Sequence, residues 1–147
     1  MKTSTSWREK LEKENPSHGK IIRILIPKPL DVEALIRKIP TGKLATLGQI
    51  MDKLAIDANA DKSCAKVTGI FLCIIAEAAE EDLERGEKII TPYWRVIKND
   101  GSLNNKFPGG VNRQAMYLKK EGHTIEPSRG KKPPKVKDFE SKLYSFE

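Results

Sequence analysis

The sequence has no apolar run that approaches the roughly 18 residues needed to span a bilayer, and its first twenty residues are too polar for a secretory signal. These absences predict a cytoplasmic protein that has no membrane partner and that associates with the nucleoid if it is prokaryotic. Aromatic residues make up only 6% and hydrophobic residues 38% of the 147 positions, which fits one compact domain with a modest core.

Cysteine and histidine are also scarce, with two of each in the chain. Cys64 and Cys73 fall within one predicted helix, so they cannot form a disulfide with each other. The two histidines add too few ligands for a structural zinc site. We therefore expect reduced thiols, no bound metal and no cofactor.

Positive charge, by contrast, is abundant. The formal net charge is +7 and the isoelectric point is about 9.4. A basic small domain is compatible with nucleic-acid binding, but ribosome-associated and ordinary soluble proteins share this property. Charge alone therefore does not decide the function.

The chain divides into three predicted parts. These are a polar N-terminal extension over residues 1–20, a domain over 21–127, and a basic, proline-containing and loosely held C-terminal tail over 128–147. The extension carries a short predicted helix around SWREKLEKE. The domain opens with a strand in KIIRILIP and a helix in LDVEALIRKIP, where Asp31 is the expected N-cap and Pro40 ends the helix.

Two helices separated by a short polar link then predict a helix-turn-helix. In TLGQIMDKLA, Thr46 is followed three residues later by Gln49, a capping box in which each side chain bonds the other's free backbone N–H. After the link IDANADKS, the segment CAKVTGIFLCIIAEAAEEDLER predicts a second helix of about 22 residues that ends at Gly86.

The spacing of apolar residues predicts which face of this second helix is buried. At about 100° per residue, one cluster is expected to face the core. It consists of Val67, Phe71, Ile74, Ile75 and Ala78. A second face carries Lys66, Ile70, Cys73, Glu77, Glu81 and Glu84. Glu77 lies about 16 Å along the helix from Lys66, beyond the Debye length of about 8 Å, so an anion beside Lys66 would feel the acidic stripe only weakly.

The remaining motifs follow in order. KIITPYWRVI predicts an extended segment interrupted by Pro92, and KNDGS predicts a tight turn. FPGGVNRQAMYLKKEGH begins with a glycine pair and predicts a helix that carries Val111, Ala115 and Leu118 and closes at Gly122.

Four of these motifs together resemble the DNA-binding domain of the alkylguanine-DNA alkyltransferases over residues 39–125. The motifs IPTGKLATLGQI, AKVTG, PYWRVIKNDGSLN and FPGGVNRQAMYLKKEGH stand where that family has I-P-x-G-x-V-x-T-Y-G-x-I, A-R-A-V-G, P-C-H-R-V and G-G-L…E-G. The resemblance implies a mainly α fold with short strands and a winged-helix-like helix-turn-helix. It also implies a protein that holds DNA through the minor groove and flips an alkylated guanine into a pocket.

In this register the acceptor cysteine of the enzymes is replaced by Tyr93, its histidine partner by Trp94, and the relay glutamate is Glu121. Alkyl transfer needs a thiolate made by a neighbouring base, whereas a phenol has an ordinary pKa of about 10. We therefore expect no methyltransferase activity. The chain resembles the alkyltransferase-like proteins, which recognise O6-alkylguanine without reversing it and mark it for nucleotide excision repair.

The resemblance also implies which side chains form the site. The expected lesion pocket consists of Tyr93, Trp94, Arg95, Phe107, Gly109 and Gly110, and the expected DNA contacts are Thr46, Leu47, Gln49, Ser63 and Lys66. Two alternatives stay open here. Tyr93 and Trp94 either line the pocket or fill the core, and Arg95 is either a phosphate or pocket-wall contact or a structural ion-pair partner.

Three departures from the family pattern leave other functions open. Leu47 replaces a tyrosine, Lys66 replaces the arginine that fills the gap left by the flipped base, and 23 residues separate Gly69 from Pro92 where the family has about 13. The expected partner is double-stranded DNA, with a repair protein as a second partner and the chain as a monomer. The alternatives are a lesion-independent DNA-binding or regulatory module, or a protein-interaction module that uses the acidic helix.

Overall fold

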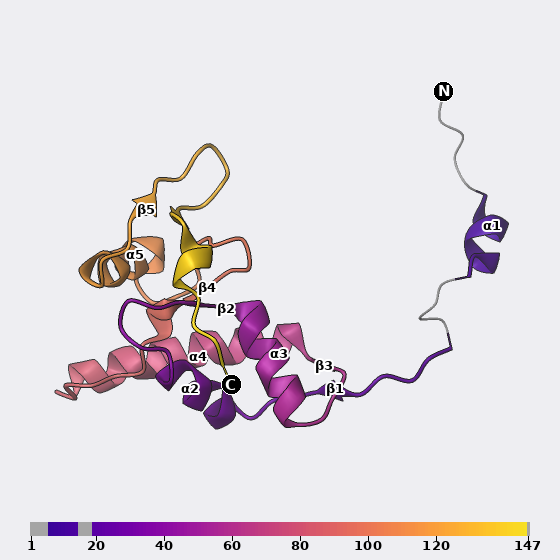
Figure 1. Cartoon of the computed structure of the whole chain (residues 1–147), viewed down its shortest axis with the longest axis horizontal. Coiled ribbons are helices and arrows are strands. Elements are labelled where there is room, and N and C mark those ends of the chain that lie inside the picture. Colours follow the sequence, from indigo (N-terminus) through magenta and orange to yellow (C-terminus); the bar gives the residue numbers. More distant parts are fainter. Residues whose placement is uncertain (1–5, 15–18, 147) are drawn as a thin grey trace.

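The computed structural model describes residues 6–14 and 19–146 of the chain. Helices dominate this part, as expected (Figure 1). They are α1 (Trp7–Glu12), α2 (Pro29–Arg37), α3 (Leu47–Asp57), α4 (Ala65–Glu84) and α5 (Gly110–Lys120), with short 3-10 helices η1 (Tyr93–Arg95) and η2 (Phe139–Lys142). The strands are β1 (Ile24–Leu25), β2 (Ala45–Thr46), β3 (Lys62–Ser63), β4 (Val96–Ile97), β5 (Ile125–Glu126) and β6 (Lys135–Val136).

The six strands form three two-stranded pairs that connect segments next to the helices. β1 pairs with β3 and β2 with β4, both in parallel, and β5 pairs with β6 antiparallel. Ala45 lies opposite Val96, and Thr46 opposite Ile97. Because β2 leads directly into α3 and β4 follows directly after η1, the β2–β4 pair holds the start of α3 beside the Tyr93–Arg95 turn.

The helix α2 begins two residues before the predicted cap. Pro29 stands at the first helical position, where its missing N–H costs nothing, and Lys28 is the N-cap. Asp31 lies in the first turn, so its assignment as N-cap was wrong. The helix ends at Arg37, before Pro40.

The helix α4 is rotated relative to the prediction. Its buried residues are Thr68, Leu72, Ile75, Ala76, Ala79 and Glu80. Of the five residues predicted to be buried, only Ile75 is, whereas Ile74 is half exposed and Val67, Phe71 and Ala78 are partly covered. The prediction failed because it weighted large apolar side chains. The buried face instead carries two alanines and a carboxylate, Glu80, which finds its hydrogen-bond partners in η1 and α5.

The segment 128–147 is not the loosely held tail that we predicted. Val136 is fully buried and Phe139 nearly so, and both belong to the main core. The chain then runs back across the domain (Figure 1), where Leu44 N donates to Lys142 O at 2.9 Å and Tyr144 N donates to Leu44 O at 2.7 Å. The prediction gave weight to the many charged residues of this segment and overlooked the few apolar residues, Val136 and Phe139, that pack in the core.

The N-terminal extension is only partly described, since residues 1–5 and 15–18 lie outside the described residues. The predicted short helix is α1, capped by Ser6, whose side chain accepts from Glu9 N at 3.1 Å. None of its residues is buried. No helix in the described ranges is long and apolar enough to cross a membrane.

The packing of Phe139 provides a test of the C-terminal segment. We predict that Phe139→Ala lowers the free energy of unfolding by about 3–5 kcal/mol, because it leaves a cavity beside Gly101. The exposed neighbour Lys137→Ala should change it by less than about 0.5 kcal/mol. Chemical denaturation measured by circular dichroism checks both values, and equal stabilities of the two variants would contradict the prediction.

Candidate nucleic-acid interface

The capping box predicted at the start of α3 is confirmed. Thr46 Oγ1 accepts from Gln49 N at 3.2 Å, and Gln49 Oε1 accepts from Thr46 N at 2.9 Å, which completes the capping box. Gly48 N donates to Asn99 Oδ1 at 2.8 Å. A Cβ at Gly48 would lie at this same 2.8 Å from the Asn99 oxygen, so glycine allows α3 to start against the turn that follows β4.

Most of the predicted DNA contacts use their polar groups within the protein. Gln49 Nε2 donates to Tyr144 O at 2.9 Å, and the buried Ser63 donates from its hydroxyl to Met51 O at 2.7 Å. Leu47 is half-buried and packs against the core. Lys66 alone of the five predicted contacts is exposed, in the first turn of α4. The role of all five toward DNA stays a prediction.

A hollow of about 590 Å³ lies along the exposed face of α4 that begins with Lys66. It is lined by Ala65, Lys66, Gly69, Ile70, Cys73, Ile74, Lys98, Asn104 and Lys106. Three lysines thus surround an apolar floor in which Ile70 and Ile74 are about half exposed, and no carboxylate lines it. Lysines bind phosphates, and apolar side chains pack against the sugars of a minor groove, so this chemistry suits a nucleic-acid backbone.

The thiol in this hollow is not set up as a nucleophile. Burial raises the pKa of Cys73, and although Lys106 lowers it, Glu77 raises it further, so the pKa stays above its ordinary value. A raised pKa leaves little thiolate near neutral pH. Cys64 caps the N-terminus of α4 and is likewise a free cysteine.

The aromatic side chain of Tyr93 lies at the centre of the core. It has no exposed surface, and its ring makes edge contacts with Trp94 at 5.4 Å, Phe107 at 5.2 Å and Tyr117 at 6.2 Å between centroids. Trp94 also stacks on Tyr117 at 4.3 Å. In this structure the cluster is therefore filled by its own rings, and neither Tyr93 nor Phe107 borders open space.

The buried carboxylate of Glu80 joins this cluster to α4. Tyr93 and Tyr117 donate from their hydroxyls to Glu80 Oε1 at 3.1 and 2.8 Å, and Arg113 lies 3.5 Å from the same oxygen. Burial, together with the neighbouring Glu80 charge and hydrogen bond, raises the pKa of Tyr93 well above its ordinary value. Burial and the same carboxylate raise the pKa of Tyr117 to about 12. Both phenols are therefore neutral donors.

A second carboxylate, Glu121, holds the next two residues of the turn. Trp94 Nε1 donates to it at 3.0 Å, and Arg95 Nη2 at 2.7 Å. Arg95 also donates to Ile39 O and to Thr41 Oγ1. Burial alone would raise the pKa of Glu121, but the hydrogen bonds from Arg95 and Trp94 outweigh burial and lower it. For Arg95 the structural ion pair is therefore the alternative that the structure supports.

The glycine pair shapes the turn between Phe107 and α5. Gly109 has φ +75°, and a Cβ there would lie 2.8 Å from Arg113 Cβ. Gly110 has φ +66°, and its N–H donates to Phe107 O at 2.8 Å. Glycine adopts such angles without the strain that most other residues incur, so both glycines favour this backbone conformation.

Sequence reasoning missed three residues that assemble this region. Gln114 is fully buried, donates from Nε2 to Trp94 O at 3.1 Å and Val96 O at 3.0 Å, and accepts from Asn104 N at 2.8 Å. Glu80 and Tyr117 were not singled out. Glu80 could have been found from its place on the same helical face as Leu72, Ala76 and Ala79. A comparison of helix faces by the size of their apolar side chains alone ranks this face low.

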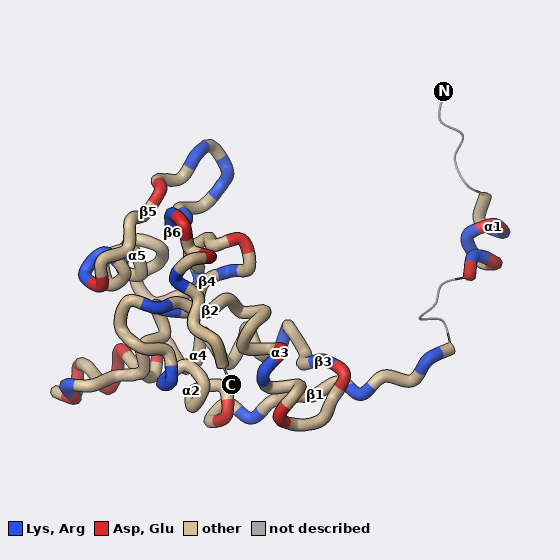
Figure 2. The backbone as a smooth tube through the Cα atoms, viewed as in Figure 1, with Lys and Arg blue, Asp and Glu red and all other residues tan. Residues whose placement is uncertain are grey.

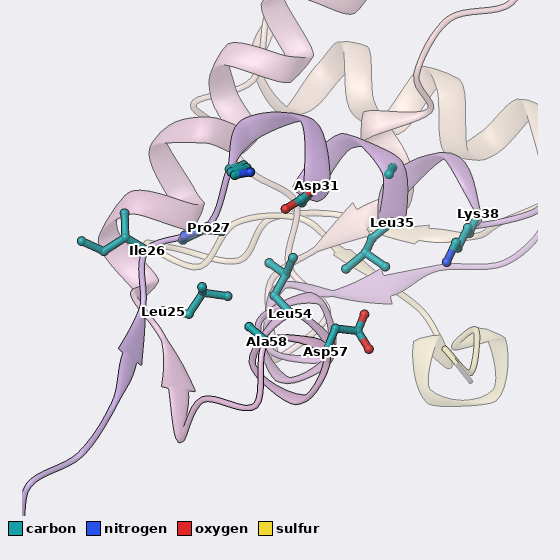
Figure 3. Close-up of a pocket in the computed structure, with 11 residues that line it drawn as sticks. Leu25, Ile26, Pro27, Asp31, Leu35, Lys38, Leu54, Asp57 and Ala58 are labelled. Carbon is teal, nitrogen blue, oxygen red and sulfur yellow. The ribbon is translucent and has the colours of Figure 1, made fainter.

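Another hollow, of about 380 Å³, includes Trp94 and Arg95 in its lining, together with Pro92 and residues of the segments 37–41 and 88–90. The hollow drawn in Figure 3, of about 410 Å³, lies between β1, α2 and the end of α3, and its walls include Leu25, Leu35 and Leu54 with Asp31, Lys38 and Asp57 at the edge. It contains none of the predicted site residues. In residues 6–14 and 19–146 no cluster of three or more His, Cys, Asp or Glu is arranged to hold a metal.

The role of Glu80 as the acceptor for both Tyr93 and Tyr117 can be tested by substitution. We predict that Glu80→Ala lowers the free energy of unfolding by about 1–3 kcal/mol, because two buried hydroxyls lose their acceptor. Glu77→Ala, one turn earlier on the exposed face, is the matched control and should change it by less than about 0.5 kcal/mol. If the two variants were equally stable, Glu80 would not be a structural acceptor.

The raised pKa values of Tyr93 and Tyr117 predict how stability depends on alkaline pH. A folded-state pKa above the ordinary value of about 10 gives stability that is complete below that pH. This stability is lost as pH rises toward the folded-state pKa, about 12 for Tyr117. The tyrosinate absorbance of Tyr93 and Tyr117 should therefore appear only as the protein unfolds, and Glu80→Gln should lower the midpoint of their titration. Titration of every tyrosine near pH 10 in the folded protein would contradict this.

Comparison with known proteins gives a consistent result. A family model described as "6-O-methylguanine DNA methyltransferase, DNA binding domain" matches residues 29–123. Two crystal structures share the fold at 19% sequence identity, each covering 80% of this chain and 94% of the other. One is S. pombe Atl1 in complex with damaged DNA containing O6-carboxymethylguanine, at a TM-score of 0.55, and the other is S. pombe ATL in complex with DNA, at 0.54. A search of curated proteins gave no match.

The structural likeness, at this identity, concerns the fold, which is the mainly helical architecture that the four sequence motifs predicted. The family match includes all four motifs completely and ends at residue 123, two residues before the end of the predicted range. Because it covers more than half of the 147 residues, the chain belongs to the 6-O-methylguanine DNA methyltransferase DNA-binding domain family.

Proposed function

We propose that this protein is a non-enzymatic DNA-binding protein that recognises O6-alkylguanine in duplex DNA on behalf of repair. The observation that carries the proposal is the environment of Tyr93, which stands at the acceptor position in the motif register PYWRV. Its hydroxyl is buried and donates to Glu80. Membership of the family and the shared fold with S. pombe Atl1, which was crystallised with damaged DNA, support the DNA-binding part.

Alkyl transfer has no chemical basis at this position. The reaction displaces guanine from an alkyl carbon and needs a soft, ionised nucleophile. The pKa of Tyr93 is raised by burial and by Glu80, so its phenolate is not formed near neutral pH. Trp94 has no basic nitrogen and already donates to Glu121. The residues that would make a base relay here hold the turn together instead.

The hollow beside Lys66 is the proposed DNA-contact surface. The N-terminal half of α4 enters the minor groove, Lys66, Lys98 and Lys106 contact phosphates, and Ile70 and Ile74 pack against sugars. The acidic side chains follow farther along α4, and Figure 2 shows them gathered toward its C-terminal end. That half of the helix extends past the groove, away from the phosphates.

Lesion recognition requires the aromatic cluster to open. A flipped base would displace Phe107 from its contact with Tyr93, and the turn at Gly109 and Gly110 is the segment whose backbone freedom permits this. Base flipping costs a few kcal/mol, which stacking of about 1–3 kcal/mol on the exposed rings offsets. An alkyl group on guanine adds apolar contact with Tyr93 or Trp94 and so favours the modified base.

The filled cluster also favours a second candidate function. If Tyr93 and Phe107 stay packed in the complex, the protein binds duplex DNA without flipping any base, as a lesion-independent module. The substitutions Leu47 and Lys66, which replace the family's tyrosine and arginine, are in line with this alternative.

Fluorescence anisotropy with matched duplexes that contain either O6-methylguanine or guanine tests the proposal. We predict tighter binding to the modified duplex and no loss of the methyl group from the DNA after incubation. Equal affinities would leave only the lesion-independent function, and demethylation of the duplex would overturn the non-enzymatic assignment.

Substitution of Lys66 tests the contact surface in the same assay. Lys66→Ala should reduce the slope of log affinity against log salt by about 1, because one phosphate contact is lost. Lys38→Ala, an equally exposed lysine beside the hollow of Figure 3, is the charge-matched control and should leave the slope unchanged. Equal effects of the two variants would mean that Lys66 contributes only net charge.

A further inference from the structure

The hairpin of β5 and β6 carries much of the positive charge of the protein on a preorganised loop. Residues 125–137 contain five basic side chains and one acidic one, Glu126. Figure 2 shows the loop as a largely blue stretch that extends beyond the helices. The family-like motifs end before this segment, at His123.

The loop is folded to its tip. The ladder Ile125 with Val136 and Glu126 with Lys135 continues in the same register to a bridge between Arg129 and Lys132. These two residues exchange backbone hydrogen bonds of 3.3 and 2.9 Å, which closes a two-residue turn in which Gly130 has φ +59°. A positive φ at the first turn residue is what a tight hairpin requires. The basic side chains are therefore held on a defined scaffold at low entropic cost on binding.

Arg129 and Lys132 at the tip share a hollow with Asp100 and Glu126, but neither carboxylate forms an ion pair with them. Arg129 and Lys132 lie directly opposite each other, an arrangement in which like charges repel and cost stability. Among the described residues, no carboxylate forms an ion pair with any basic side chain of the hairpin. Lys135 differs, because it lies opposite Glu126 and near Asp100. An anion bound at the tip would relieve the repulsion between Arg129 and Lys132.

The hairpin is joined to the proposed DNA surface through one segment of chain. Leu103 N donates to Pro134 O at 2.9 Å, and Val136 N donates to Gly101 O at 3.0 Å, so the turn at 99–104 runs beside β6. The same segment supplies Lys98, Asn104 and Lys106 to the hollow along α4. The basic tip and the hollow therefore flank a single loop, and an elongated polyanion is the ligand that contacts both.

We propose that the β5–β6 hairpin is a second DNA contact, in which Arg129, Lys131 and Lys132 bind backbone phosphates of the duplex beyond those held by α4. This rests on the proposed DNA-binding function and extends its footprint. The contact reads no sequence and no lesion, because it reaches only phosphates. The hairpin contact adds electrostatic affinity to that of the lesion-specific contact, and this added affinity depends on salt.

The test compares K131Q/K132Q with K28Q/K38Q, which removes the same charge from exposed lysines beside α2. Salt titrations by anisotropy should give K131Q/K132Q a slope shallower by about 2, since each phosphate contact contributes about 0.9. The control should keep the wild-type slope. On duplexes shortened stepwise from one end, the difference between wild type and K131Q/K132Q should vanish once the duplex no longer reaches the hairpin. Circular dichroism melting should show both variants folded.

The outcomes separate the two proposals. Wild-type binding with equal slopes for K131Q/K132Q and K28Q/K38Q would overturn the hairpin contact and leave the proposed function intact. The same holds if K131Q/K132Q is weakened equally on all duplex lengths, which would indicate long-range charge alone. Failure of the wild type to bind any duplex at low salt would overturn the proposed function and the hairpin contact with it.

Discussion

The contact on which the rest of this structure depends is the buried carboxylate of Glu80 with its two phenols. A carboxylate is expensive to bury, and it is tolerated here because Tyr93 and Tyr117 donate to it and Arg113 lies at its edge. The three donors come from η1 and α5, whereas Glu80 comes from α4. One polar centre thus fixes the long helix against η1 and α5, which carry two of the four family motifs, and it fixes the Tyr93 ring in the middle of the core.

Two further side chains complete the same frame. Gln114 joins α5 to the backbone at Trp94 and Val96, and Glu121 joins the end of α5 to Trp94 and Arg95. The side chains of Trp94 and Arg95, and the backbone carbonyls of Trp94 and Val96, thus form their hydrogen bonds within the protein. The consequence is a division of labour along the chain. The side chains of the motif PYWRV bond within the protein, and the groups that would contact DNA in the proposed function lie outward, on the first turns of α4, on the loop 98–106 and on the hairpin.

This division explains how charge is used. Along α4 the acidic residues begin at Glu77, about 16 Å along the helix from Lys66, which exceeds the Debye length of about 8 Å, so they act only weakly on the surroundings of Lys66. Lysines that face open space beside exposed isoleucines suit the surface of a polyanion, whereas Arg95, in a buried pair, does not. Net charge is thus a poor guide to the proposed DNA interface, which depends on the position of a few cations that form no ion pair among the described residues.

The sequence by itself determined the local features: the capping box of Thr46 and Gln49, the glycines at positive φ, the helix boundaries near Gly86 and Gly122, and the order of motifs that identifies the family. These depend on neighbours a few residues apart. Only the tertiary structure decided which face of α4 is buried, that Val136 and Phe139 complete the core, and that Glu80 and Gln114 are internal. Such choices depend on partners 13 to 37 residues away, as for Glu80 with Tyr93 and Tyr117, and no local pattern of apolar size encodes a hydrogen bond across that separation.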